Sequence, residues 1–304
     1  MPVVDASWET WLSSNVARGC SIDSMIDAMV QAGFATEAAR AAVHKAFGRD
    51  PAEAAEAAEA VEAVEAAAPA PAATEAALVK AAPQTYQYDE SPVARGNVIR
   101  AHDRDVHVLM RCERPQVIVF ADVLSPDECN EMIERSRHRL KRSTTVNPVT
   151  GKEDVIRNRT SEGIWYQRGE DAFIEQMDRR ISSLMNWPVE NGEGLQILHY
   201  GTSGEYRPHF DYFPPDQAGS AVHTAQGGQR VATLVIYLND VADGGETIFP
   251  EAGMSVAAKQ GGAVYFRYMN GQRQLDPLTL HGGAPVRGGD KWIMTKWMRE
   301  RAYG

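Results

Sequence analysis

The feature that most constrains the fold is a succession of short, strand-like segments that fills the last third of the chain. Turns rich in Gly, Asn and Asp separate these segments, at a spacing typical of an all-β barrel or sandwich. The segments are residues 195–200, 206–212, 230–239, 245–249, 254–257, 262–269, 278–281 and 290–299. The sequence therefore predicts a mainly β domain.

Helical signals come before these strands. Ser125, Pro126 and Glu128 form a capping box with proline at the first helical position, which predicts a helix that runs to about residue 140. A second helix is expected over residues 171–186. Helices that precede a strand-rich half predict helices packed outside a β core.

Two residues of the segment 206–212 suggest metal chemistry. Alternate side chains of a strand point to one face, so His209 and Asp211 are expected to enter the same cavity. A second imidazole would complete a two-histidine, one-carboxylate face that holds Fe(II) and leaves the opposite face open to substrate and dioxygen. His281 is the candidate. Because His-x-Asp is common by chance, the surrounding sequence has to support this assignment.

That surrounding sequence is informative. The stretches LQILHYGTSGEYRPHFDYF and LTLHGGAPVRGGDKWIMTKWMRERAYG, with GGETIFPEAG between them, resemble the prolyl 4-hydroxylase family of 2-oxoglutarate and Fe(II)-dependent dioxygenases. The resemblance runs from about Val117 to the C-terminus, with the motifs in the family's order. It implies a double-stranded β-helix, a jelly-roll or cupin-like fold, whose open end holds the metal. It also implies that His209, Asp211 and His281 are the metal ligands.

The closing strand adds a candidate cosubstrate site. Alternation places Lys291 on one face with apolar neighbours, where an ammonium group needs an anionic partner. The resemblance supplies that partner as the distal carboxylate of 2-oxoglutarate, with Tyr200 and Thr247 donating hydroxyl hydrogen bonds to it. Lys291 thus joins the three metal ligands as an expected catalytic residue.

The resemblance also suggests residues for the substrate. Tyr206 and Arg230 match family positions that face a peptidyl proline, and Trp297 matches a tryptophan near the active site. Asp211 fills the site that a halide would need, which favours hydroxylation over halogenation. Glu205 stands where family members more usually have a neutral residue. The implied products are succinate and carbon dioxide, with dioxygen as cosubstrate and ascorbate as an additional cofactor.

Two alternatives stay open on this sequence. One is an oxygenase that hydroxylates a small molecule such as a free amino acid. The other is a non-catalytic interaction protein with a β scaffold, against which the intact triad and lysine argue. The segments 143–161 and 213–228 are long for a compact domain and are candidate binding loops. Two other histidines are expected outside the triad, His199 on the opposite strand face and His223 in a loop.

The chain divides into three parts by composition. Residues 1–48 predict a small bundle of three helices, with Ser21 and Thr36 as N-caps, that is a candidate recruitment module for a protein partner. Residues 49–88 are rich in Ala, Glu and Pro, and their glutamates at every third position define no buried face, which predicts a linker. Residues 89–304 are the expected dioxygenase domain.

Charge and cysteine content limit the functional classes. The net charge of −10 argues against a general nucleic-acid binder. Three scattered cysteines fit a reducing compartment, and the N-terminus has neither the basic nor the apolar region of a secretory signal. No run approaches the length of a membrane span. The sequence therefore predicts a cytoplasmic enzyme that acts on a peptide or protein, without a nucleic-acid or membrane partner.

Overall fold

The chain forms two compact units, Met1–Ala81 and Ala82–Gly304, which are considered one at a time. The computed structural model describes residues 34–47, 85–143, 159–217 and 219–304, with residues 4, 8–9, 12, 16, 25–26, 29–30, 145–146 and 153–154.

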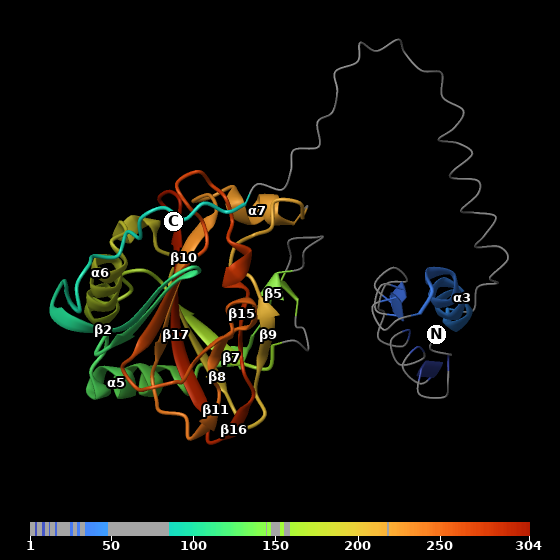
Figure 1. Cartoon of the computed structure of the whole chain (residues 1–304). Coiled ribbons are helices and arrows are strands. Elements are labelled where there is room, and N and C mark those ends of the chain that lie inside the picture. The colour runs from blue at the N-terminus through green and yellow to red at the C-terminus, as the bar shows by residue number, and fades with distance from the viewer. Residues whose placement is uncertain are drawn as a thin grey trace, which may run out of the picture. The chain divides into compact units, whose positions relative to one another are not determined.

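The second unit is built on a nine-stranded antiparallel sheet (Figure 1). Its strands, in spatial order, are β1 (Val98–Ala101), β2 (Arg104–Glu113), β3 (Gln116–Ala121), β14 (Ala263–Arg267), β10 (Arg230–Tyr237), β17 (Lys291–Arg299), β8 (Leu195–Tyr200), β7 (Glu162–Tyr166) and β4 (Lys141–Arg142). A four-stranded sheet consists of β13 (Met254–Val256), β12 (Thr247–Phe249), β15 (His281–Gly283) and β9 (Tyr206–His209). Two small antiparallel pairs complete the strands, β11 (Asp243–Gly244) with β16 (Val286–Gly288) and β5 (Thr145–Val146) with β6 (Glu153–Asp154). This mainly antiparallel β core fits a jelly-roll oxygenase fold.

Both faces of the large sheet are buried at its central strands. Along β10, Leu234 and Ile236 pack into a cluster with the helices, whereas Val235 and Tyr237 pack into a second cluster that includes residues of the smaller sheet. Nearly every residue of β10 and β17 is therefore buried, and burial along these two strands shows little alternation.

Two helices, α5 (Pro126–Ser136) and α6 (Ala172–Met185), cover one face of the large sheet, while β9 and β15 lie on its other side (Figure 1). The predicted capping box is confirmed, because the Ser125 hydroxyl accepts a hydrogen bond from the Glu128 amide and the Glu128 carboxylate accepts one from the Ser125 amide. The helix ends at Ser136, earlier than expected, because a turn leads the chain into β4, which pairs with β7. The other short helices are η1 (Val189–Asn191), α7 (Ser220–Thr224), η2 (Pro250–Ala252) and η3 (Pro277–Thr279).

Two of the predicted strands were wrong in part. The segment 206–212 is strand only as far as His209, because the pairing of β9 with β15 ends at that residue and the chain then bends away. The segment 278–281 begins as the turn η3, since Asp276 caps it and Pro277 favours a helical start. The strand β15 starts only at His281.

In the first unit the structure has the helix α3 (Thr36–Ala46). Thr36 is its first helical residue and Ala35 its N-cap, so the expected threonine cap was wrong by one position. Among the described residues, Leu12, Met25, Met29 and Val43 belong to one buried apolar cluster. Ser21 and most of the linker lie outside the described residues, and the three-helix bundle stays a prediction. In the described part of the chain no helix is long and apolar enough to cross a membrane.

Candidate active site

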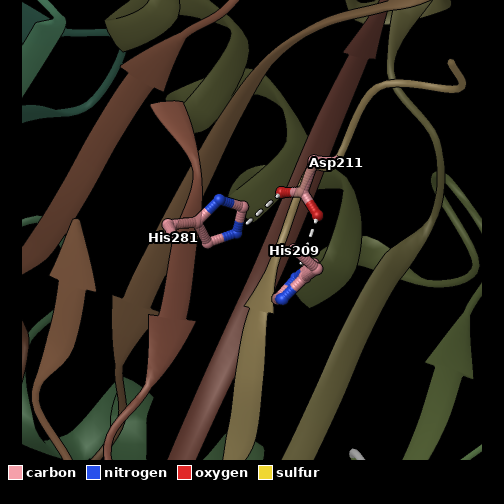
Figure 2. A group of neighbouring side chains, drawn as sticks. All are labelled: His209, Asp211 and His281. Atoms are coloured by element: carbon pink, nitrogen blue, oxygen red, sulfur yellow. Dashed lines mark ion pairs between the residues drawn. The ribbon is translucent and has the colours of Figure 1, made fainter. Parts of the chain in front are cut away.

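Two paired strands and the bend after one of them bring the predicted metal ligands together. His209 ends β9 and His281 begins β15, and the two residues face each other as an antiparallel pair. Asp211 follows β9 and returns toward both rings, although it lies outside regular strand. Figure 2 shows each imidazole directed at the Asp211 carboxylate.

The three groups are close enough to share one ion. The Nε2 atom of His209 lies 3.6 Å from Asp211 Oδ1, and the Nε2 atom of His281 lies 3.5 Å from Asp211 Oδ2. All candidate ligand atoms are within 4.8 Å of one another, and among the described residues no other group of three acidic, histidine or cysteine side chains converges in this way. Two imidazoles and one carboxylate are the donor set of non-haem Fe(II) oxygenases.

Backbone carbonyls orient both imidazole rings. The Nδ1 atom of His209 is 2.9 Å from the Arg207 carbonyl, and that of His281 is 3.0 Å from the Thr279 carbonyl. A carbonyl can only accept, so each Nδ1 must carry the proton and each Nε2 is left with a free lone pair. The Thr233 hydroxyl donates to Asp211 Oδ2 at 2.7 Å and fixes the carboxylate. This arrangement suits a cation and was not predicted from the sequence.

Burial and charge favour the ligand forms of these groups. Burial lowers the pKa of His281 to about 4, so the ring is neutral near pH 7. Burial would raise the pKa of Asp211, but the nearby histidines and Arg230 outweigh that effect and hold it well below its usual range. A neutral imidazole and an ionised carboxylate are the forms that bind metal.

The three metal-ligand residues line a cavity of about 850 Å³, and the predicted cosubstrate residues line it as well. Lys291, Ile293, Thr295 and Trp297 of β17 all line it, as the alternation predicted. Lys291 is buried, yet within the described part of the chain its ammonium makes no hydrogen bond or ion pair. Burial lowers its pKa to about 8. A buried cation without a counter-ion is strongly unfavourable, so this lysine fits an anionic ligand.

Tyr200 and Thr247 lie on the same cavity wall as the lysine. The Lys291 Nζ atom is 5.8 Å from the ring centre of Tyr200 and equally far from that of Tyr237. The Tyr237 hydroxyl donates to Thr247 Oγ1 at 2.8 Å. The Thr247 hydroxyl proton is therefore free to be donated into the cavity. Tyr237 was not predicted as a site residue, although it is the last residue of β10 and shares a strand face with Val235, which packs into the second cluster.

The predicted substrate residues also line the cavity, and two of them, Tyr206 and Arg230, contact metal-ligand residues. The Tyr206 ring stacks on His209 with ring centres 3.6 Å apart, and the Arg230 guanidinium lies 4.2 Å from the ring centre of Trp297. Arg230 does not face water, as a strand-edge charge would, but pairs with the buried Glu193 at 2.7 Å. Glu205, which stands where family members more usually have a neutral residue, is half-buried and is not among the residues that line the cavity.

Sequence reasoning missed several lining residues. Arg299 continues the alternation of β17 beyond Trp297, and Gln196 continues that of β8 inward from Tyr200, so the same period of two could have found both. Glu193 precedes β8 and gave no such signal. Arg159 lines the cavity from the loop 143–161, most of which lies outside the described residues.

The two other histidines differ in outcome. His199 is turned away from the cavity and its Nε2 is 3.1 Å from Asp290, as expected for the opposite strand face. His223 was placed in a loop, which was wrong, because it lies in α7, lines the cavity and stacks on Phe213. The segment 213–228 is therefore a partly helical wall of the site.

Comparison with known proteins agrees with this geometry. A sequence profile of the 2OG-Fe(II) oxygenase superfamily matches residues 195–299. Probable prolyl 4-hydroxylase 10 of Arabidopsis thaliana is 40% identical over 208 residues, which cover 62% of this chain and 70% of the relative. Prolyl 4-hydroxylase 5 of the same plant is 41% identical with the same coverage.

Solved structures similar to this one include a viral collagen prolyl hydroxylase from Paramecium Bursaria Chlorella virus-1. It is 27% identical with a TM-score of 0.48, over 60% of this chain and 95% of the viral one. The identity to the plant enzymes and their coverage decide the family. The chain belongs to the prolyl 4-hydroxylase family of 2-oxoglutarate and Fe(II)-dependent oxygenases.

Proposed function

We propose that this chain hydroxylates proline residues of a peptide or protein substrate. The observation that carries the proposal is a single cavity that holds three converging ligands, a buried lysine without an ion-pair partner among the described residues, and the aromatic and cationic side chains of Tyr206, Trp297 and Arg230. The plant relatives, which are named as prolyl 4-hydroxylases, support the choice of substrate.

The metal-binding and cosubstrate-binding residues would have separate roles. His209, Asp211 and His281 would hold Fe(II), with each Nδ1–H donating to a backbone carbonyl so that both Nε2 lone pairs are available to the ion. Lys291 would bind the distal carboxylate of 2-oxoglutarate, assisted by Tyr200 and Thr247. When bound, iron and 2-oxoglutarate supply the oxidising chemistry with dioxygen and release succinate and carbon dioxide. The buried walls of the cavity keep water from the reacting groups.

Tyr206, Trp297 and Arg230 would orient the substrate. The two aromatic side chains line the cavity and would contact the proline ring and the neighbouring peptide. Arg230, held between Glu193 and Trp297, can donate to a substrate carbonyl. Ascorbate would serve as an auxiliary reductant.

The division into a recruitment module (1–48), a linker (49–88) and a catalytic domain (89–304) belongs to the same proposal. The module would bind a protein partner or a large substrate, and tethering would raise the effective substrate concentration at the cavity. Scattered cysteines favour the cytoplasm.

The test combines the purified chain with Fe(II), 2-oxoglutarate and a proline-containing peptide. Succinate should form, and mass spectrometry should find one added oxygen atom on proline. His209→Ala and Asp211→Ala should abolish both signals, because each removes one of three ligands. The matched control is His199→Ala, a nearby histidine that faces away and should retain turnover.

Undiminished succinate from both ligand variants would refute the metal assignment. Hydroxylation of free amino acids but of no peptide would instead identify a small-molecule oxygenase.

A further inference from the structure

A second lysine of β17 is completely buried on the side of the strand away from the cavity. Lys296 places its Nζ atom 2.6 Å from Asp178 Oδ1 of α6, and it donates a second hydrogen bond to the main-chain carbonyl of Glu193. Asp178 is also fully buried, and its other oxygen accepts from the Gly169 amide at 2.9 Å. The lysine thus connects a helix to the segment that enters β8.

Strand β17 forms hydrogen bonds with both the main-chain amide and the main-chain carbonyl of Glu193. The Glu193 amide donates to the Trp297 carbonyl at 3.0 Å, while its carbonyl accepts from Lys296. A Cβ atom added to the preceding Gly192 would lie 2.8 Å from Lys296 Nζ, so the lysine packs directly against this backbone. Two consecutive residues of β17 therefore fix the position of Glu193.

The Glu193 side chain lines the cavity, so the position of its backbone affects the cavity wall. Its Oε1 atom accepts from Arg230 Nε at 2.7 Å and from Arg299 Nε at 2.6 Å. Burial would raise the pKa of Glu193, but the two guanidinium groups outweigh it and hold the pKa below its usual range. One buried carboxylate thereby orients two cavity-lining arginines.

Each arginine then reaches a different part of the site. Arg230 stacks on Trp297 and directs Nη1 to the Asp211 carbonyl at 3.4 Å. Arg299 donates to the carbonyls of His223 and Gly228 at 2.9 and 2.8 Å, which anchors the wall that contains α7. The contacts are continuous from Lys296 to both walls of the cavity.

Stability alone does not account for the buried pair. Replacing a buried ion pair with apolar residues of similar size is often neutral or stabilising, because both charges lose their hydration. An apolar residue at position 296 could not, however, hold the Glu193 carbonyl. The Lys296–Asp178 pair therefore fixes the position of the Glu193 carbonyl, which well-packed apolar side chains could not do.

We propose that Lys296, paired with Asp178, is a positioning residue for the peptide side of the active site and acts through Glu193 on Arg230 and Arg299. The inference rests on the proposed function insofar as the substrate is a peptide. Preorganised side chains bind tightly because less order has to be imposed on binding. Loss of the lysine should therefore weaken peptide binding while iron and 2-oxoglutarate bind as before.

The experiment compares two variants of the full chain. Lys296→Met removes the ammonium, and the double variant Asp178→Leu with Lys296→Met also removes the carboxylate, so that no uncompensated charge is left to prevent folding. The control is Arg180→Met, in the helix α6 that also contains Asp178. Arg180 is equally buried and pairs with Asp103 and Glu128 at 2.7 Å, but it does not line the cavity.

In the Lys296 variants the KM for a proline peptide should rise about tenfold, while the KM for 2-oxoglutarate stays within about twofold. Arg180→Met should lower the melting temperature at least as much with an unchanged peptide KM. Hydrogen exchange of the amides of residues 219–228 should accelerate in the Lys296 variants and not in the control, because the Arg299 anchor depends on Glu193.

An unchanged peptide KM together with control-like exchange would overturn the proposal, and so would an equal rise in both KM values. If the wild-type chain hydroxylates no proline peptide, the proposed function fails, and the exchange of residues 219–228 still decides whether Lys296 positions the wall.

Discussion

Lys291 and Lys296 lie five residues apart on β17 and show how one strand uses the same residue type in two ways. Lys291 faces the cavity without a counter-ion among the described residues, whereas Lys296 is paired with a carboxylate on the opposite face. Burial lowers the pKa of both. The lysine without a protein partner is the one suited to a ligand.

Lys291→Ala should raise the KM for 2-oxoglutarate at least about a hundredfold, since losing the counter-charge of a desolvated carboxylate costs on the order of 3 kcal/mol. Iron binding should be retained, because the lysine is not a metal ligand. The measurement is succinate formation against 2-oxoglutarate concentration, with metal content determined in parallel. An unchanged KM would mean that the cosubstrate binds elsewhere.

The same lysine predicts a pH dependence. The ammonium is present below its pKa, which burial lowers to about 8, and is lost as the pH rises through that value. The KM for 2-oxoglutarate should therefore be flat below about 8 and rise above it, by roughly tenfold per pH unit. Lys291→Arg keeps its charge throughout and should show no such rise, whatever its absolute KM. The same rise in that variant would assign the titration to another group.

At the scale of elements, α5 and α6 support the large sheet from the side opposite the cavity. Both begin with side-chain caps, Ser125 for α5 and Asp171 for α6. The Ser125 cap was predicted from the sequence because a cap involves only residues within one helical turn, whereas Asp171 was expected only as the start of its helix. The two caps stabilise the helices without contacting the ligands.

Ser125→Ala should lower the free energy of unfolding by about 1 kcal/mol, because the Glu128 amide loses its acceptor. Chemical denaturation measures the loss, and Ser125→Asn is the control that should recover most of it. The KM values for peptide and 2-oxoglutarate should not change. A changed KM would show that α5 influences the cavity.

At the scale of the chain, the position of the boundary between the two units determines which deletions should leave the catalytic unit intact. Residues 85–90 are held against the catalytic unit, where Asp89 pairs with Arg267 at 2.6 Å and the Gln87 carbonyl accepts from Asn270 at 2.8 Å. The end of the predicted linker thus contacts the enzyme. A deletion that ends before these residues should leave the catalytic fold intact.

Removal of residues 1–83 should keep both KM values for 2-oxoglutarate and a short proline peptide within about twofold, while hydroxylation of a large protein substrate falls. Removal of residues 1–95 is the matched control. It also deletes Asp89 and should lower the melting temperature, because the buried Arg267 loses its carboxylate. If the shorter deletion folds but cannot hydroxylate the short peptide, residues 1–83 form part of the active site.

Local features and the identities of the chemical groups followed from the amino-acid sequence alone. The Ser125 cap, strand alternation along β8 and β17 and the two-residue spacing of His209 and Asp211 depend on neighbours in the chain, so the helices, most strands and this pair of ligands could be predicted. The third ligand, His281, was predicted from the family resemblance. Where the pairing partner set the limits of an element, as at the end of β9, the prediction failed.

Which distant groups meet depends on the tertiary structure. Glu193 joins Arg230 and Arg299, and Lys296 reaches Asp178 across 118 positions of sequence. Such contacts have no period and no fixed spacing, because they depend on how the sheet packs against α6. Burial of the two lysines follows from the same packing. Lys291 is buried without an ion-pair partner among the described residues and is suited to a ligand, whereas Lys296 is buried against Asp178.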